Sequence, residues 1–194
     1  VGFTGNQDHY YDPRNSYLNE VLERQTGIPI TLSLVTMAVG ARLGMRIVGI
    51  PSPGHFVVMA ERGGERILFD PFHQGRLLEV DDCEMLVRES AGLDVRITLA
   101  NLEPATAAAF VTRILTNLKG CYLRTGDFRR AARVIRRLRQ VAPRDWTQSR
   151  DLGACLLQAG QAGKAIDALN LYLEQVPEAL DKEAVAKLLR QAHA

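Results

Sequence analysis

The sequence has few of the residues that build disulfide frameworks and metal centres. Its three cysteines form no CxxC pair, so we expect neither a disulfide framework nor a zinc site built on thiolates. The residues that could be combined as other metal ligands are His9, His55, His73 and Asp70. No HxH or HExxH spacing joins them, so we expect no metal and no cofactor.

Long apolar runs are also absent. An uncharged run over residues 26–41 contains Thr31, Ser33 and Gly40, so it is short for a membrane span and typical of a buried helix. The first fifteen residues are polar and rich in turn formers, unlike a signal peptide. We expect a soluble, cytoplasmic protein with no membrane contact. Because residue 1 is Val and not Met, we also expect that an N-terminal piece is missing or was removed.

Charge is distributed unevenly along a chain of ordinary globular composition, 46% hydrophobic and 24% charged. The net charge of +2 conceals a basic middle segment. Residues 1–103 carry nine arginines and fourteen acids, whereas residues 104–150 carry eleven basic and two acidic side chains. Residues 151–194 are again slightly acidic. The basic segment is suited to dock on the acidic module or to meet an acidic partner.

The C-terminal half matches itself when it is shifted by 34 residues. The matching pairs are Leu118 and Leu152, Cys121 and Cys155, Gly126 and Gly160, Ala131 and Ala165, and Pro143 and Pro177. This period and pattern resemble the tetratricopeptide repeat, a helix pair that commonly presents a surface to a protein partner. We therefore predict an all-α segment over residues 104–194, with two repeats and a capping helix.

The repeated residues have physical roles in such helix pairs. Gly126 and Gly160 suit the turns between paired helices, because glycine readily adopts positive φ. Ala131 and Ala165 are small enough for close helix crossings, so both should be buried.

Arginines gather on the predicted helix around Ala131. The candidate partner-binding residues are Arg129, Arg130, Arg133, Arg136 and Arg137. They lie mostly off the apolar stripe, so they form either a solvated helix face or a basic strip for an acidic protein partner. Nucleic acid is the weaker alternative, because no aromatic residues interleave with the arginines to stack bases.

The first half predicts a helix followed by an antiparallel sheet. The helix begins at Pro29, which is tolerated in a first turn, and runs to about residue 43. It is apolar nearly all round and should lie in the core. The predicted strands are residues 46–50, 55–61 and 66–70, with a glycine hairpin turn at residues 63–64.

These elements resemble the transglutaminase-like, papain-related fold, an α+β core that we assign to residues 1–103. The resemblance rests on a core helix ending in residues 41–44, a strand that opens with His55 and a strand that ends at Asp70. It implies a cysteine nucleophile at the helix start, a histidine base and an aspartate that orients it. His55 and Asp70 match the last two, but Pro29 occupies the nucleophile position.

A closer resemblance is to the SirB-type bacterial family, which joins this core to tetratricopeptide repeats. The matching segments are residues 15–18 (NSYL), 27–30 (GIPI), 53–56 (PGHF) and 70–73 (DPFH). The resemblance implies a fold and an ancestral chemistry rather than a particular reaction. We expect a His55–Asp70 hydrogen bond, which fits a vestigial site, a purely structural pair or a binding pocket.

Substitutes for the missing nucleophile are poor. The hydroxyls of Thr31 and Ser33 lie further along the helix, and Cys83 has acidic neighbours that raise its pKa. We therefore favour a non-catalytic pseudo-enzyme, a scaffold whose repeats bind a protein partner. One alternative is a peptide or amide hydrolase or acyltransferase with an unorthodox nucleophile. The other is a regulator that contacts an acidic partner or nucleic acid through the arginines.

Overall fold

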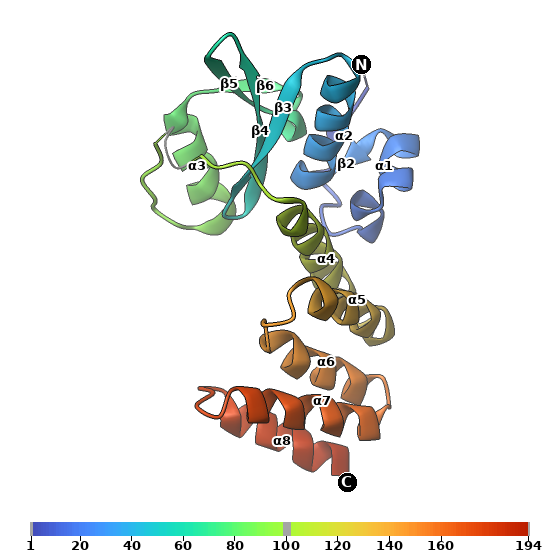
Figure 1. The fold of residues 1–194 in the computed structure, drawn as a ribbon. Coiled ribbons are helices and arrows are strands. Elements are labelled where there is room, and N and C mark those ends of the chain that lie inside the picture. The colour runs from blue at the N-terminus through green and yellow to red at the C-terminus, as the bar shows by residue number, and fades with distance from the viewer. Residues whose placement is uncertain (1, 99–101, 194) are drawn as a thin grey trace. The chain divides into compact units, whose positions relative to one another are not determined.

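The computed structural model describes residues 2–98 and 102–193 and divides the chain into two compact units, Val1–Phe110 and Val111–Ala194 (Figure 1). The first unit mixes helices with a small antiparallel sheet, and helices follow it, which confirms the predicted fold class. The elements of the first unit are β1 (Thr4–Gly5), η1 (Pro13–Ser16), α1 (Leu18–Arg24), β2 (Thr26–Gly27), α2 (Pro29–Arg42), β3 (Arg46–Ser52), β4 (His55–Arg62), β5 (Glu65–Asp70), η2 (Pro71–His73), β6 (Arg76–Leu78) and α3 (Val80–Ala91).

The main sheet has the order β3-β4-β5-β6, and all its neighbours are antiparallel. The three predicted strands are present, and the β4–β5 hairpin turns at Gly63 and Gly64, both at positive φ. The sequence interpretation missed β6 and α3. β6 has only three residues, Arg76–Leu78, and shows no alternation of apolar and polar side chains that would indicate a strand.

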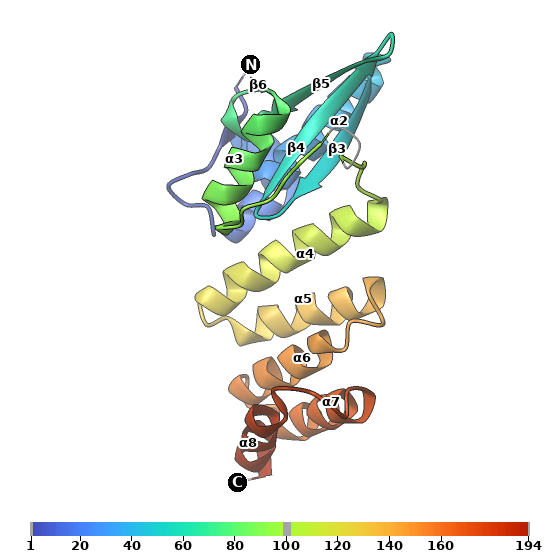
Figure 2. The ribbon, with the colours of Figure 1, turned by 90° about the vertical axis from the view of Figure 1, so that its left-hand side faces the viewer.

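Helices α2 and α3 lie on opposite sides of the sheet (Figures 1 and 2). On the α3 side, Cys83 packs in one apolar cluster with Val57, Met59 and Leu68. On the α2 side the backbone approaches β3 closely: a Cβ added at Gly40 would lie 2.5 Å from Ile47 Cδ1. The sheet is therefore covered on both faces, and the first five residues of β4 are buried.

The expectation that α2 lies wholly in the core is only partly right. Its first residues are buried, but Val39 and, just beyond the helix, Leu43 are 51% and 70% exposed. The second half of α2 lines an open, largely apolar cavity of about 890 Å³ together with Phe3 and Phe69. The apolar sequence of α2 therefore predicted burial along the whole helix, but mainly its first half is buried.

The second unit continues the chain as successive helices. They are α4 (Ala107–Arg124), which contains the boundary between the units, α5 (Phe128–Val141), α6 (Thr147–Gln158), α7 (Ala162–Gln175) and α8 (Lys182–His193). Gly126 and Gly160 form the turns between paired helices with φ of 70° and 73°. Ala131 and Ala165 are 0% exposed and belong to one apolar cluster contributed by α4, α5, α6 and α7. Both expectations about these residues are confirmed.

No helix within the described ranges is long and apolar enough to cross a membrane.

Candidate functional site

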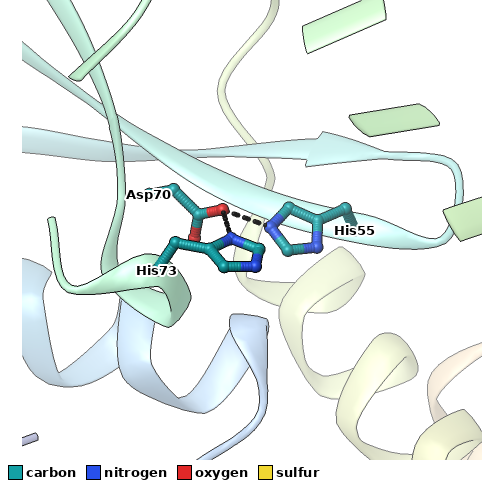
Figure 3. Close-up of side chains that lie close together, drawn as sticks. All are labelled: His55, Asp70 and His73. Carbon is teal, nitrogen blue, oxygen red and sulfur yellow. Dashed lines mark hydrogen bonds and ion pairs between the residues drawn. The ribbon is translucent and has the colours of Figure 1, made fainter. Parts of the chain in front are cut away.

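His55 and Asp70 form a buried hydrogen-bonded pair in the first unit. His55 Nε2 lies 2.7 Å from Asp70 Oδ2, and the two side chains are 7% and 0% exposed (Figure 3). The expected hydrogen bond is therefore present. Its catalytic role stays a prediction, because the contact serves a structural pair equally well.

The hairpin places the two residues together. Val58 pairs with Phe69 across β4 and β5, so the start of β4 and the end of β5 lie at the same end of the hairpin. His55 is the first residue of β4 and Asp70 the last residue of β5. The sequence therefore sets the distance between them through two strands of nearly equal length and a tight glycine turn.

The structure adds His73 to the pair. His73 Nδ1 also lies 2.7 Å from Asp70 Oδ2, and the His55 and His73 rings are nearly parallel with centroids 5.8 Å apart (Figure 3). The sequence pattern marks His73 only as one of four residues that could be combined as metal ligands. The sequence signal for the position of His73 is the Asp70-Pro71 turn. Asp70 caps η2, and the third residue of η2, His73, returns toward the Asp70 carboxylate.

Asp70 is the acceptor on which this cluster depends. Its other oxygen, Oδ1, accepts a hydrogen bond of 2.8 Å from the Phe72 N–H. Burial by itself would raise the pKa of Asp70, but the hydrogen bonds from His55, His73 and the Phe72 amide favour the charged form more strongly. The pKa of Asp70 therefore lies below its ordinary value, and the carboxylate is charged at neutral pH.

Pro29 begins α2, as the sequence predicts. The helix contacts β4 and η2, which carry His55 and His73. The resemblance implies that the first turn of the helix faces the His55–Asp70 pair, and this stays a prediction. Thr31, a candidate substitute nucleophile, is fully buried, and its hydroxyl lies 2.8 Å from the Asn15 carbonyl and 3.1 Å from the Ile28 N–H. These two hydrogen bonds tie the Thr31 hydroxyl to the backbone and argue against its use in catalysis.

The cysteines do not offer an activated thiol. Cys83, Cys121 and Cys155 are all buried. Burial is the main cause that raises the pKa of both Cys83 and Cys155 to about 11. The negative charges of Asp82 and Asp70 add to the effect at Cys83. The predicted direction for Cys83 is confirmed, although burial contributes more than its acidic neighbours do.

The candidate partner-binding arginines lie on α5. All five of them, Arg129, Arg130, Arg133, Arg136 and Arg137, are exposed. Arg130 pairs with Asp127 at 3.2 Å and Arg137 donates a hydrogen bond to Gln140. Arg129, Arg133 and Arg136 form no ion pair with any residue that the structure describes. Their guanidinium groups are therefore available to an acidic ligand, and their role as a binding strip stays a prediction.

The fold and the buried His–Asp pair define a transglutaminase-like core joined to tetratricopeptide helices. A family model described as the transglutaminase-like superfamily matches residues 1–116, and a tetratricopeptide repeat model matches residues 118–190. The chain belongs to the transglutaminase-like superfamily. The order of the two matches confirms the arrangement expected from the sequence.

Relatives extend the similarity over nearly the whole chain and support the SirB-type resemblance. A UPF0162 protein of Xylella fastidiosa is 38% identical over 180 residues, which cover 91% of this chain and 64% of that relative. A UPF0162 protein of Vibrio cholerae is 27% identical over 190 residues, 97% of this chain and 68% of its own length. F-box only protein 21 of Mus musculus is 37% identical over 93 residues, 44% of this chain and 15% of that protein. No solved structure matches the chain.

Proposed function

We propose that the protein is a non-catalytic transglutaminase-like scaffold whose repeats, placed at residues 104–194, hold a protein partner. The proposal rests on Pro29, which begins α2 at the position where the resemblance implies the nucleophile. Proline has no acid–base group and no nucleophile, so His55 and Asp70 have nothing at that position to activate. The tetratricopeptide helices supply the second half of the proposal, because stacked helix pairs present extended binding surfaces.

The rival function is a peptide or amide hydrolase or acyltransferase with an unorthodox nucleophile. One observation favours it: the hydroxyl of Ser33, one turn along α2 from Pro29, is fully buried and has no hydrogen-bond partner among the described residues. An unsatisfied buried hydroxyl requires an explanation, and a substrate is one candidate. The buried His55–Asp70 pair would be its base only if the hydroxyl faced the imidazole.

Alkylation of the native protein tests the non-catalytic proposal. We expect Cys83, Cys121 and Cys155 to resist iodoacetamide at pH 7.5, because all three are buried. At Cys83 and Cys155 a pKa of about 11 also leaves roughly 100-fold fewer reactive thiolates than an ordinary thiol has. Mass spectrometry of labelled peptides measures each site, and denatured protein provides the control in which all three react. Rapid labelling of native Cys83 that disappears in His55→Gln would support the enzyme instead.

Binding of an acidic ligand to α5 is testable by removing exposed positive charges from the helix. We expect a fluorescent polyglutamate peptide to bind the full chain with an affinity that falls as salt rises. Replacing Arg129, Arg133 and Arg136 with Ala should weaken it about tenfold, as three exposed ion pairs are lost. Fluorescence anisotropy measures the affinity.

The matched control for this measurement replaces the same three arginines with Lys, which keeps the charge and should keep most of the affinity. If the Ala and Lys variants bind alike, the arginines are a solvated helix face. If single-stranded DNA binds the parent protein more tightly than polyglutamate does, the regulator alternative gains support.

A further inference from the structure

One carboxylate oxygen in the first unit is shared by two imidazoles. Asp70 Oδ2 lies 2.7 Å from both His55 Nε2 and His73 Nδ1, and the three atoms lie within 4.8 Å of one another (Figure 3). The scaffold function makes no use of this cluster, and a Cys-His-Asp arrangement has no place for a second histidine. We propose that His55, Asp70 and His73 bind a divalent transition-metal ion of the Zn²⁺ type.

The ligand set is built by a single turn and one neighbouring strand. Asp70 ends β5 and caps η2, Pro71 fixes the first φ of that turn, and His73 closes it. In a 3-10 turn, positions three apart lie on the same side, so His73 returns over the carboxylate. His55 arrives separately, at the start of β4. Ligands assembled in this way have no HxH or HExxH spacing, which is why the sequence pattern predicts no metal.

The surrounding contacts hold the ligand atoms in place. The Phe72 N–H fixes Asp70 Oδ1 at 2.8 Å and leaves Oδ2 toward the imidazoles. The Phe72 ring packs edge-on against His55, with centroids 5.9 Å apart, and against His73 at 5.1 Å. Metal ligands depend on such outer contacts for their orientation. The three side chains are therefore positioned before an ion arrives.

The chemistry of the donors selects the class of ion. Two imidazoles and one carboxylate suit Zn²⁺ and its transition-metal neighbours, whereas Mg²⁺ and Ca²⁺ prefer all-oxygen sets. Bonds of about 2.0–2.1 Å in a tetrahedral site place ligand atoms about 3.3 Å apart, so the two short contacts need to open by about 0.6 Å. The ion replaces the protons of both hydrogen bonds. It also compensates the negative charge of Asp70, which is 0% exposed.

An ion can reach the cluster from the side of His73. The His73 side chain is 38% exposed and lines a polar cavity of about 550 Å³ together with Asn6 and Asp8. His55 and Asp70 form the closed side of the site. A site with three protein ligands and one open side leaves a position for water or another small ligand.

Titration with the metal alone tests the proposal. We expect calorimetry of the chelator-treated full chain to show one Zn²⁺ bound per chain, and Co²⁺ to give visible absorption bands of a low-coordinate site. His73→Gln and His55→Gln should each weaken Zn²⁺ binding at least about tenfold. His9→Gln is the matched control, because His9 is exposed and lies outside the cluster; it should bind as the parent does.

Two results would overturn the metal site: no saturable binding at one ion per chain, or equal affinity in His73→Gln and the parent protein. Because His73 is partly exposed, that variant should keep its fold, which far-UV circular dichroism checks. Polyglutamate binding is the second readout, and it should be the same in His73→Gln and the parent. Failure of the metal site therefore leaves the scaffold proposal standing, and the converse also holds.

Discussion

Replacing Asp70 with Ala should lower the free energy of unfolding of the first unit by about 3 kcal/mol or more. The carboxylate is 0% exposed and accepts hydrogen bonds from His55, His73 and the Phe72 N–H. Its removal leaves the Phe72 N–H and the His55 imidazole inside the protein without an acceptor, and each such loss costs about 1–3 kcal/mol. Because the cluster ties the β4–β5 hairpin to η2, the effect should spread over these elements.

The measurement must read the two units separately. Hydrogen exchange of peptides from β4 and β5, followed in increasing urea, reports the first unit. Fluorescence of Trp146, which packs with Tyr172 and Val185, reports the second unit and should not change. Asp94→Ala is the control, because the Asp94 side chain is 84% exposed in its ion pair with Arg88 and should matter little. Equal effects of the two substitutions would mean that the cluster contributes little to stability.

Most of the fold could be predicted from local patterns in the sequence. The helix from Pro29, the strands around His55 and Asp70 and the 34-residue period were all predictable, because each depends on spacing and turn chemistry within a short segment. The strand β6 was not, since three residues contain too little pattern. The exposure of Val39 was also missed, because the apolar character of a helix indicates burial without showing what covers each part of it.

The candidate site also has a part that could be predicted from the sequence and a part that could not. The pairing of His55 with Asp70 follows from a hairpin with nearly equal arms, so the sequence sufficed. The position of His73 depends on a three-residue helical turn and on the side-chain directions that it sets, and pattern alone does not give these. The main cause of the raised pKa of Cys83 is burial by packing between α3 and the sheet, a tertiary feature; the sequence showed only its acidic neighbours.

Pro29→Cys should create a thiol whose pKa lies below the ordinary value of about 8.5. The family resemblance puts the nucleophile at this position, and the structure makes it the first residue of α2. There the positive helix end stabilises a thiolate, and the His55 imidazole would add to the effect if it faces the helix start; such groups lower cysteine pKa values to about 3.5–7.5. The first turn tolerates the change. Cysteine brings back the backbone N–H that proline lacks, but the N–H of the first helical residue has no acceptor within the helix, whichever residue stands there.

Thiolate absorbance near 240 nm, recorded as a pH-dependent difference from the parent protein, measures this pKa and removes the signal of the three native thiols. The double variant Pro29→Cys, His55→Gln tests whether His55 affects the pKa of the introduced thiol. If the imidazole faces the helix start, its loss should raise the thiol pKa and cut the thiolate fraction at pH 7 about tenfold. If the thiol has an ordinary pKa and this pKa is the same with and without His55→Gln, the first turn of α2 does not face the His55–Asp70 pair. Pro29 would then no longer support the non-catalytic proposal, and Ser33, with its buried hydroxyl, would become the first residue to substitute.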